Sequence, residues 1–331
     1  MGTAAGGTSK IMIAVIMVVI ISAAGFLYVL SNPTILSNFV IPTDEVDDSR
    51  IQGIDSPLKI VGDEEMREVA EEFGFLGTGS RADPYVIENL SIVSEGNCID
   101  IRNVEASFEI RGCSVAIYNW QYSAICIYIS NCQDACIVNC RTEGGISGIE
   151  VFQSDGCRVL DCTAKYSIFG LNFSLSDFPK VSNCIIDNNT EGIVLVGSHN
   201  ANLTKNGIFR NVNGIRSQWT NGSFMTSNNI TSNTQGVLLE QGCNNWTITS
   251  NWITFNDDYG IHLDSGVSFT CMYANMFGWN IVNNAKDDGL DNKWDESELE
   301  EGNFWHDYTG TGWYAIPGVA ESIDHYPQLL E

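Results

Sequence analysis

Positive charge is scarce in this chain of 331 residues, in which 16 lysines and arginines stand against 41 aspartates and glutamates. The formal net charge of −25 at pH 7 repels phosphate backbones, so we expect no nucleic-acid partner. Between residues 89 and 276 no segment has both the length and the period of an amphipathic helix, which leaves short strands as the main element of the fold.

One long apolar run lies near the start. Residues 11–30, IMIAVIMVVIISAAGFLYVL, carry no charge, and at ~1.5 Å per residue such a helix spans ~30 Å, the thickness of a bilayer core. Lys10 precedes the run, so the positive-inside rule predicts a single-pass membrane anchor with residues 1–10 in the cytoplasm and the rest outside. The alternative is a signal peptide cleaved at Ser22-Ala23-Ala24. Because the apolar run continues past that site, we favour the anchor.

A glycine followed by a large apolar residue recurs at a nearly constant interval. The interval is 22 residues four times and 24 residues once, and the pairs are Gly148-Ile149, Gly170-Leu171, Gly192-Ile193, Gly214-Ile215, Gly236-Val237 and Gly260-Ile261. Weaker copies at Asn89-Leu90 and Gly112-Cys113 extend the repeat to about nine units.

Each unit alternates apolar and polar residues in short runs, separated by clusters of Asn, Gly, Ser and Asp, which is typical of strands and turns. A repeat of this length built only from short strands must coil so that equivalent strands stack in parallel. The sequence therefore predicts an all-β fold, a right-handed parallel β-helix of about nine coils.

Residues at equivalent positions of a solenoid form columns. We expect three columns. The first is an inward apolar column of Ile149, Leu171, Ile193, Ile215, Val237 and Ile261, and the second is an inward thiol column of Cys113, Cys140, Cys162 and Cys184. The third is a turn column of Asn139, Asn183, Asn206, Asn228, Asn251 and Asn275. Eleven cysteines in an exported chain suggest disulfides. However, the number is odd and a buried free cysteine packs as a small hydrophobe, so we predict a packing ladder. The sequence leaves undecided whether two of Cys132, Cys136 and Cys157 form one disulfide.

The two ends of a solenoid need covers. Asp63 is expected to cap a helix through residues 64–74 that ends at Gly74 and buries one face: Met66, Val69, Ala70 and Phe73. Residues 277–331 leave the repeat and carry four of the eight tryptophans, which indicates a C-terminal cap rich in aromatic and acidic residues. The predicted organisation is a stalk at 31–62, the β-helix with its capping helix at 63–276, and the cap at 277–331.

Three stretches carry a resemblance to a known family. They are GTGSRADPYVIENLSI (77–92), the Gly-hydrophobic repeats and GNFWHDYTGTGWYAIPGVAESIDHYP (302–327). They resemble the exported right-handed β-helix proteins common in archaea, which are grouped with NosD-type periplasmic proteins and, more broadly, with pectate-lyase-like folds. The resemblance covers roughly residues 60–331 and implies the fold. For activity it implies a common theme of carbohydrate binding or processing, on a fold that also hosts adhesins and scaffolds.

Outward residues of adjacent coils become neighbours. Glu240 and Asp264 fall at equivalent positions, which places them ~5 Å apart in the ideal case, the spacing of the two carboxyl groups of retaining glycosidases. His262 and Arg216 project from the same side, so Glu240, Asp264, His262 and Arg216 form our catalytic hypothesis. The alternative is that Glu240 and Asp264 are ordinary solvated strand residues.

The candidate binding residues are Trp219 and Gln218 on the same face, and the pair Asp257-Asp258. This pair is similar to the paired aspartates of polygalacturonases, although the Gly-His-Gly and Arg-Ile-Lys of those enzymes do not occur in the sequence. Two aspartates before a glycine also suit a simple turn.

Two metals are considered. The acidic run at 285–303 could bind calcium through Asp287, Asp288, Asp291 and Asp295, without the spacing of an EF-hand, or it is a solvated loop. Copper sites need clustered soft ligands. The four histidines are dispersed, and only His306 and His325 share a module, so copper is not favoured.

Three functions follow. We favour a membrane-anchored cell-surface protein that binds glycans or serves as a structural or adhesive module, because no motif commits a residue to chemistry. The alternatives are a polysaccharide hydrolase or lyase that uses the Glu240 and Asp264 face, and a NosD-like accessory factor in metalloenzyme maturation.

Overall fold

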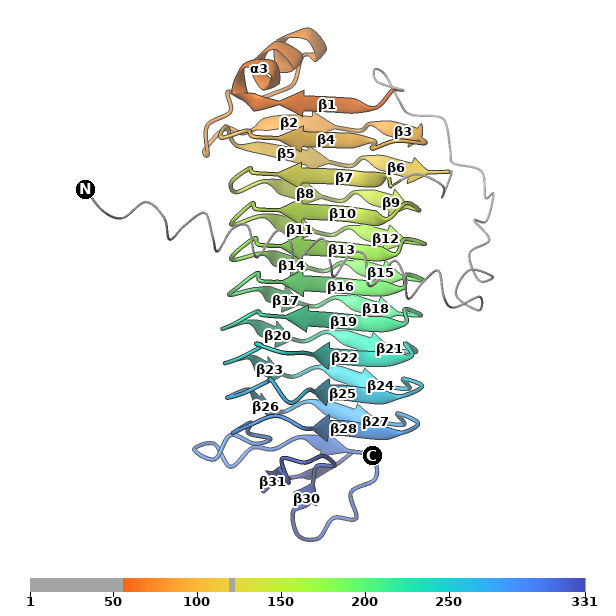
Figure 1. The fold of residues 1–331 in the computed structure, drawn as a ribbon, viewed down its shortest axis with the longest axis vertical. Coiled ribbons are helices and arrows are strands. Elements are labelled where there is room, and N and C mark those ends of the chain that lie inside the picture. The colour runs from red at the N-terminus through yellow and green to blue at the C-terminus, as the bar shows by residue number, and fades with distance from the viewer. Residues whose placement is uncertain (1–55, 119–122, 331) are drawn as a thin grey trace, which may run out of the picture. The chain divides into compact units, whose positions relative to one another are not determined.

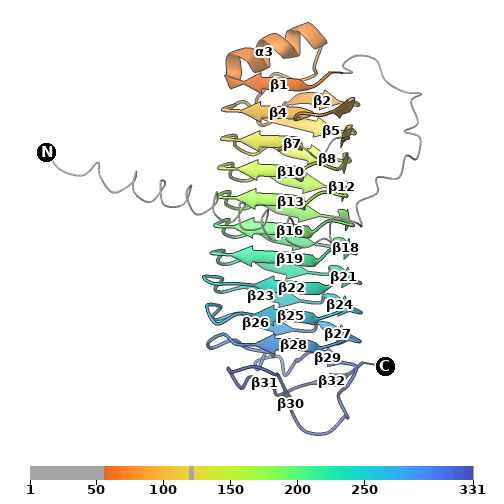
Figure 2. The same ribbon diagram turned by 45° about the vertical axis from the view of Figure 1, so that its right-hand side comes forward.

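The computed structural model describes residues 56–118 and 123–330, which wind into a solenoid with three parallel sheets (Figures 1 and 2). Consecutive strands along the chain enter different sheets, and each strand pairs in parallel with its equivalent one coil later. This is the all-β parallel solenoid that the 22-residue interval predicts.

Sheet 1 has ten strands: β1 (Leu58–Val61), β4 (Ile99–Arg102), β7 (Ile125–Ser130), β10 (Ser147–Phe152), β13 (Phe169–Ser174), β16 (Glu191–Val196), β19 (Asn213–Gln218), β22 (Gln235–Leu239), β25 (Tyr259–Leu263) and β28 (Asn283–Asp287).

Sheet 2 has nine strands: β2 (Tyr85–Glu88), β5 (Phe108–Arg111), β8 (Cys136–Val138), β11 (Arg158–Leu160), β14 (Lys180–Ser182), β17 (Asn202–Thr204), β20 (Phe224–Thr226), β23 (Thr247–Thr249) and β26 (Cys271–Tyr273).

Sheet 3 has eleven strands: β3 (Ser91–Ser94), β6 (Ser114–Ile117), β9 (Arg141–Glu143), β12 (Thr163–Lys165), β15 (Ile185–Asp187), β18 (Gly207–Phe209), β21 (Asn229–Thr231), β24 (Trp252–Thr254), β27 (Met276–Gly278), β29 (Phe304–Trp305) and β32 (Gln328–Leu329). An antiparallel pair, β30 (Tyr314–Ala315) and β31 (Ile323–Asp324), lies near the end of the chain.

The solenoid has about eleven turns, so the predicted number of about nine is too low. The count depended on the glycine marker, and the outer coils lack it. The register places Cys126 opposite Gly148 at one end and Asn284 opposite Gly260 at the other. Strands β28, β29 and β32 continue the sheets into the segment that we expected to leave the repeat.

The predicted apolar column is confirmed. Its members pair in register from β10 to β25 and are completely buried: Ile149, Leu171, Ile193, Ile215, Val237 and Ile261. The glycine before each apolar residue is required by close packing between coils. A Cβ atom on Gly214 would lie 2.5 Å from the carbonyl oxygen of Gly236, which is far inside contact distance.

The thiol and amide columns that we predicted separately are one column. Cys113, Cys140, Cys162 and Cys184 continue directly as Asn206, Asn228, Asn251, Asn275 and Asn303, and all these side chains are buried. The placement of Asn139 and Asn183 among them was wrong. Both have positive φ (50° and 57°) and lie exposed in the preceding turn, one position before the column.

Thiol and amide make equivalent contacts in this column. The Cys162 thiol accepts a hydrogen bond from the backbone N–H of Cys140 (3.4 Å) and donates to the carbonyl oxygen of Ile137 (3.5 Å). The Asn206 side chain accepts from the N–H of Cys184 (2.9 Å) and donates to the carbonyl oxygen of Val181 (3.1 Å). All eleven cysteines are free, so the disulfide left open among Cys132, Cys136 and Cys157 is absent from this structure.

Helix α3 (Gly62–Phe73) lies at the N-terminal end of the solenoid, next to β1 (Figure 1). Met66 and Ala70 are buried and Gly74 ends the helix with φ 68°, as predicted. Two details differ. The carboxylate of Asp63 does not cap the helix but accepts hydrogen bonds from the N–H groups of Glu105 and Ala106. Phe73 is exposed, because the helix buries a narrower face than expected.

At the other end, the buried column finishes at Asp324, whose carboxylate accepts hydrogen bonds from the backbone N–H of Asn303 (2.8 Å) and the indole N–H of Trp305 (2.9 Å). Among the described residues no helix is long and apolar enough to cross a membrane. The anchor predicted at residues 11–30 lies outside the described part of the chain.

Candidate functional site

The outward face of sheet 1 brings together charged and amide side chains from β16, β19 and β22. The alternation of each strand turns apolar residues into the core and leaves the residues between them outside. The parallel register stacks Glu191, Asn213 and Gln235 in one column, and it places Val194 beside Arg216 and Val196 beside Gln218 in two others.

Arg216 is the centre of this cluster. Its Nε lies 2.5 Å from Oε2 of Glu240, its Nη1 lies 3.8 Å from Oε1 of Glu191, and the side chain is only 23% exposed. Gln218 donates its amide to the same Oε2 of Glu240 at 2.7 Å. One guanidinium therefore stands between two carboxylates from coils on either side of it.

Glu191 has an unusual protonation equilibrium. Burial raises the pKa of its carboxyl group to about 7, although the positive charge of Arg216 and a hydrogen bond from Asn213 oppose the shift; the nearby charge of Glu240 raises it further. The side chain is 7% exposed. A carboxyl group with this pKa is present in both its neutral and its charged form near neutral pH, which is the property of a proton-exchanging group.

The cluster has unused hydrogen-bonding capacity. Three buried atoms on this face lack a partner among the described residues: Oε2 of Glu191, Oε1 of Gln218 and Nε2 of Gln235. A buried polar atom without a partner costs about 1–3 kcal/mol. In a native protein such atoms need a partner, for example an ordered water or a bound group.

A second group of charges lies two coils further on the same face. Nε2 of His262 lies 3.1 Å from Oδ2 of Asp288, and Nζ of Lys286 lies 2.5 Å from the same oxygen. Burial acts to raise the pKa of Asp288. The hydrogen bonds from Lys286, the Val319 N–H and His262 outweigh it and hold that pKa at about 2. This carboxylate is therefore a permanent negative charge at neutral pH.

The predicted carboxylate pair has a different arrangement. Glu240 and Asp264 do stand on adjacent coils, since the N–H of Asp264 donates to the carbonyl oxygen of Leu239. The Glu240 carboxylate, however, is held by Arg216 and Gln218, and Oδ1 of Asp264 accepts from the N–H of Ser265 in its own turn. The structure thus brings Glu240 together with Arg216 and Gln218, and joins His262 to Asp288.

The other binding candidates lie at turns. Trp219 has a positive φ of 50° and leans over the next coil, where a Cβ atom on Gly242 would lie 2.6 Å from its ring. Asp257 and Asp258 follow β24, with their N–H groups bonded to the carbonyl oxygens of Asn233 and Thr234. These aspartates stay a prediction as ligand-binding residues.

Three of the four aspartates proposed for calcium have protein partners. Asp287 is fully buried and accepts from the Trp294 indole and the Ser322 hydroxyl, while Asp288 binds His262 and Lys286. Asp295 binds His325 (2.7 Å), and Asp291 lies exposed with a φ of 54°. Within residues 56–118 and 123–330, no group of three or more His, Cys, Asp or Glu side chains is arranged to hold a metal ion.

The sequence reasoning missed one residue of this face, Glu191, and it named Asp288 and His262 without expecting them to be partners. A signal for Glu191 existed, because it precedes Gly192 by one position and therefore stacks with Asn213 and Gln235. For Asp288 the signal was hidden, since its coil carries Asn284 where the marker glycine was sought.

Comparisons with known proteins agree with the fold. A family model described as NosD, periplasmic copper-binding protein, matches residues 106–310. No curated protein sequence matches the chain.

Solved structures with a similar fold include three from different contexts. The A-module of mannuronan C-5 epimerase AlgE4 from Azotobacter vinelandii is 13% identical, with a TM-score of 0.49, over 65% of this chain and 82% of that one. The periplasmic alginate epimerase AlgG is 14% identical, with a TM-score of 0.44, over 76% and 72%. PfbA, a surface adhesin of Streptococcus pneumoniae, is 10% identical, with a TM-score of 0.39, over 67% and 78%. At these identities the similarity concerns the fold alone.

Proposed function

The chain belongs to the NosD family of periplasmic proteins, and on that premise we propose that it works outside the cytoplasm as a β-helix module that binds saccharides on the outward face of sheet 1. The observation that carries the proposal is the cluster around Arg216. It combines a guanidinium, two carboxylates and three amides on one face, with three buried polar atoms still without partners.

Sugar hydroxyls are matched by this set of groups. A hydroxyl donates one hydrogen bond and accepts two, so it satisfies a carboxylate or amide oxygen and an amide N–H together. The unpartnered atoms of Glu191, Gln218 and Gln235 are shielded from solvent, so sugar hydroxyls would reach them, and remove their cost, once these side chains turn outward on binding. Coils repeat every ~4.8 Å, close to the length of one pyranose unit in an extended chain, which suits a polymer lying along the solenoid.

The location is part of the same proposal. We keep the anchor at residues 11–30, which would hold the β-helix at the outer surface of the membrane within reach of cell-surface glycans.

Copper is the ligand that the family description names, and the described residues do not fit it. All four histidines lie in the described part of the chain and have separate partners. Nδ1 of His199 accepts from the Asn221 N–H, Nδ1 of His306 accepts from the Trp279 N–H, and His262 and His325 bind different aspartates. The thiols are buried in the core apart from the half-buried Cys271. Any accessory role in metalloenzyme maturation must therefore use contacts other than a clustered copper site in this part of the chain.

An enzymatic function has one observation in its favour. Glu191, with a pKa raised to about 7, and Glu240 flank the same guanidinium, so a carboxyl group that can hold a proton near neutral pH stands close to a second carboxyl group. This would support polysaccharide cleavage by the pair Glu191 and Glu240, with Glu191 as the acid, in place of the predicted pair Glu240 and Asp264.

The test is binding and cleavage of a panel of neutral and acidic polysaccharides by the full-length chain, with and without calcium. We expect retardation by at least one polysaccharide in affinity electrophoresis and no cleavage. Arg216→Gln should weaken binding about tenfold. The matched control is Arg141→Gln, which removes a guanidinium paired with Glu143 on sheet 3 and should change nothing.

Equal loss in both variants, or no binding to any polysaccharide, would reject the sheet 1 site. Cleavage that is lost in Glu191→Gln would replace the binding module with the enzyme.

A further inference from the structure

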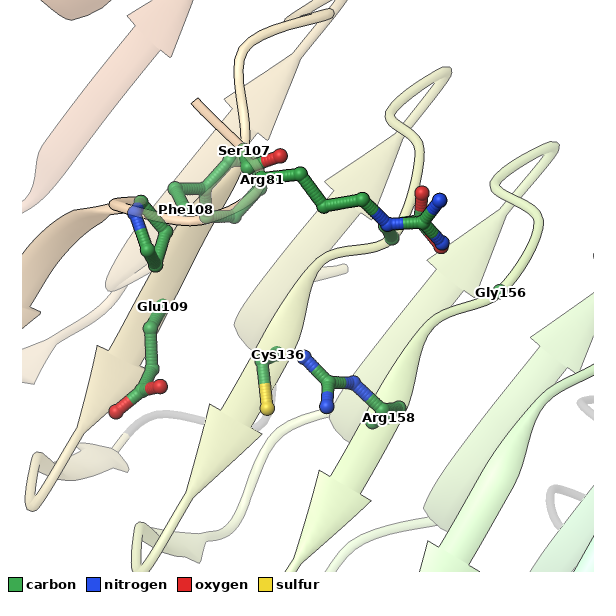
Figure 3. A pocket seen from close by; sticks show the side chains of 9 residues that line it. Arg81, Ser107, Phe108, Glu109, Cys136, Gly156 and Arg158 are labelled. Carbon is green, nitrogen blue, oxygen red and sulfur yellow. The ribbon is translucent and has the colours of Figure 1, made fainter. Parts of the chain in front are cut away.

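A pocket of about 320 Å³ lies on sheet 2, well away in sequence from the Arg216 cluster (Figure 3). Its lining comes from β5, β8 and β11 and from the loop that precedes β2. Figure 3 shows Arg81 extending from that loop above the pocket, Arg158 turning toward Cys136, and Glu109 on the opposite side. The volume is at the lower end of the range for small-molecule sites, ~300–1,000 Å³.

Most charges around the pocket have ionic partners. Nη2 of Arg81 lies 3.1 Å from Oδ1 of Asp134, and Nη1 of Arg111 lies 3.5 Å from Oε1 of Glu109. Arg158 is the exception. Among the residues that the structure describes, no carboxylate oxygen lies within ion-pair distance of its guanidinium.

The next coil adds a second cation. Lys180 stands directly beside Arg158 in the parallel register of β11 and β14, and within the described ranges it also lacks an ion pair. Like charges side by side on neighbouring strands destabilise a sheet. Both side chains are exposed, so their repulsion is small, and two adjacent cations without a paired acid leave donors that an anionic ligand can use.

We infer that this pocket binds a sugar acid through its carboxylate, with Arg158 as the principal contact and Lys180 beside it. A guanidinium offers two parallel N–H groups that match a carboxylate. The opposite side supplies groups for ring hydroxyls, since Glu109 accepts hydrogen bonds and the Ser107 hydroxyl accepts or donates them.

The assignment of a sugar acid, in preference to a bare anion, rests on the mixed lining. A site for a small inorganic anion would have donors on every side, whereas Glu109 and Asp134 would repel such an ion. A ligand with a carboxylate at one end and hydroxyls at the other satisfies both sides of the pocket.

This site goes beyond the proposed function, because it lies on another sheet and takes one charged sugar unit instead of a polymer. The two tests are therefore independent. Arg216→Gln should leave the pocket unchanged, and Arg158→Gln should leave polysaccharide binding on sheet 1 unchanged.

The experiment is a calorimetric titration of the full-length chain, kept soluble in mild detergent, with glucuronate, glucose and succinate. We expect glucuronate to bind and both glucose, which lacks the carboxylate, and succinate, which lacks the ring hydroxyls, to bind at least tenfold more weakly. Arg158→Gln should weaken glucuronate about tenfold, and Arg158→Lys should weaken it less. The control is Lys205→Gln, which removes an exposed cation from a turn on another coil and should have no effect.

The inference is overturned if glucose binds as well as glucuronate, or if Lys205→Gln costs as much as Arg158→Gln. Succinate binding as tightly as glucuronate would overturn the sugar assignment. Arg158 is exposed, so its variants should fold, and an unchanged melting temperature would verify this.

Discussion

The side-chain oxygen of Asn206 accepts the backbone N–H of Cys184 at 2.9 Å, and this one bond joins the thiol half of a buried column to its amide half. In the thiol half, the sulfur of Cys162 accepts a hydrogen bond from the N–H of Cys140 in the preceding coil. In the amide half, the side-chain oxygen of Asn228 accepts in the same way from the N–H of Asn206. Two side chains of different chemistry therefore do one structural task, which leads to the first prediction.

Asn228→Ala should destabilise the protein by about 3 kcal/mol, because it leaves the buried N–H of Asn206 without its partner and removes the side-chain bond to the carbonyl oxygen of Leu203. Asn228→Cys should cost clearly less, since a thiol fills the equivalent position at Cys184. Urea unfolding measures both. The exposed neighbour Asn229 is the control, and Asn229→Ala should change stability by about 0.5 kcal/mol or less. An equal cost for Asn228→Ala and Asn228→Cys would contradict the equivalence of thiol and amide.

The cysteines should be reduced and unreactive in the folded protein. Burial raises the pKa of the Cys98 and Cys157 thiols to about 12, so their thiolate is almost absent at neutral pH, and ten of the eleven thiols are buried out of reach of a reagent. We expect a thiol reagent to label almost none of the eleven cysteines in native protein and all eleven after denaturation without reductant. Recovery of fewer than four thiols on denaturation would show that the column is bridged.

Stability should depend on pH through Glu191. The pKa of this carboxyl group is raised by burial to about 7 in the folded protein, so folding favours its neutral form. Its contribution is fully present below about pH 4.5 and is lost as the pH rises through about 7. Relative to wild type, Glu191→Gln should therefore gain stability over this window, by up to about 3 kcal/mol at pH 8.

The measurement is urea unfolding of both proteins at about pH 4.5, 6 and 8. Taking the difference between them removes the effect of the other carboxylates, which the variant leaves unchanged. Two parallel stability curves would mean that Glu191 is ionised in the folded state.

Gly214→Ala should cost about 2 kcal/mol, because the new Cβ would lie 2.5 Å from the carbonyl oxygen of Gly236 and force two coils apart. Gly96→Ala is the control, since the nearest atom to its Cβ is 3.9 Å away. Thermal unfolding compares the two. Similar melting temperatures for both variants would show that the marker glycines are not imposed by coil spacing.

Much of the fold could be predicted because in-register stacking converts a sequence interval into a column. Ile149 and Leu171, 22 residues apart, pair directly. The same logic failed where an asparagine comes directly before a cysteine, at Asn139-Cys140 and Asn183-Cys184. Asn183 and Asn206 look alike in sequence, but Asn183 has a positive φ and turns outward while Asn206 turns inward. A shift of one position moves a side chain from one face of the strand to the other, and only packing decides which of two adjacent residues points inward.

The site was less predictable because its properties depend on side-chain direction. Register alone placed Glu240 and Asp264 on adjacent coils, yet Arg216 turns to Glu240 and Asp264 turns to Ser265. The raised pKa of Glu191 depends on burial. That Arg158 has no ion pair among the described residues depends on which acids Arg81 and Arg111 bind. Side-chain direction, burial and the choice of ion-pair partner produce no periodic pattern in the sequence.

The buried column also has a direction. From Asn206 to Asn303 every amide donates to the coil that follows, so each added coil needs an acceptor and supplies a new donor. Asp324 breaks this succession, because an ionised carboxylate accepts from Asn303 and Trp305 but has no proton to pass on. The last position therefore works as a chemical terminator. It gives the solenoid a defined length and makes the C-terminal end a poor template for stacking by a second molecule.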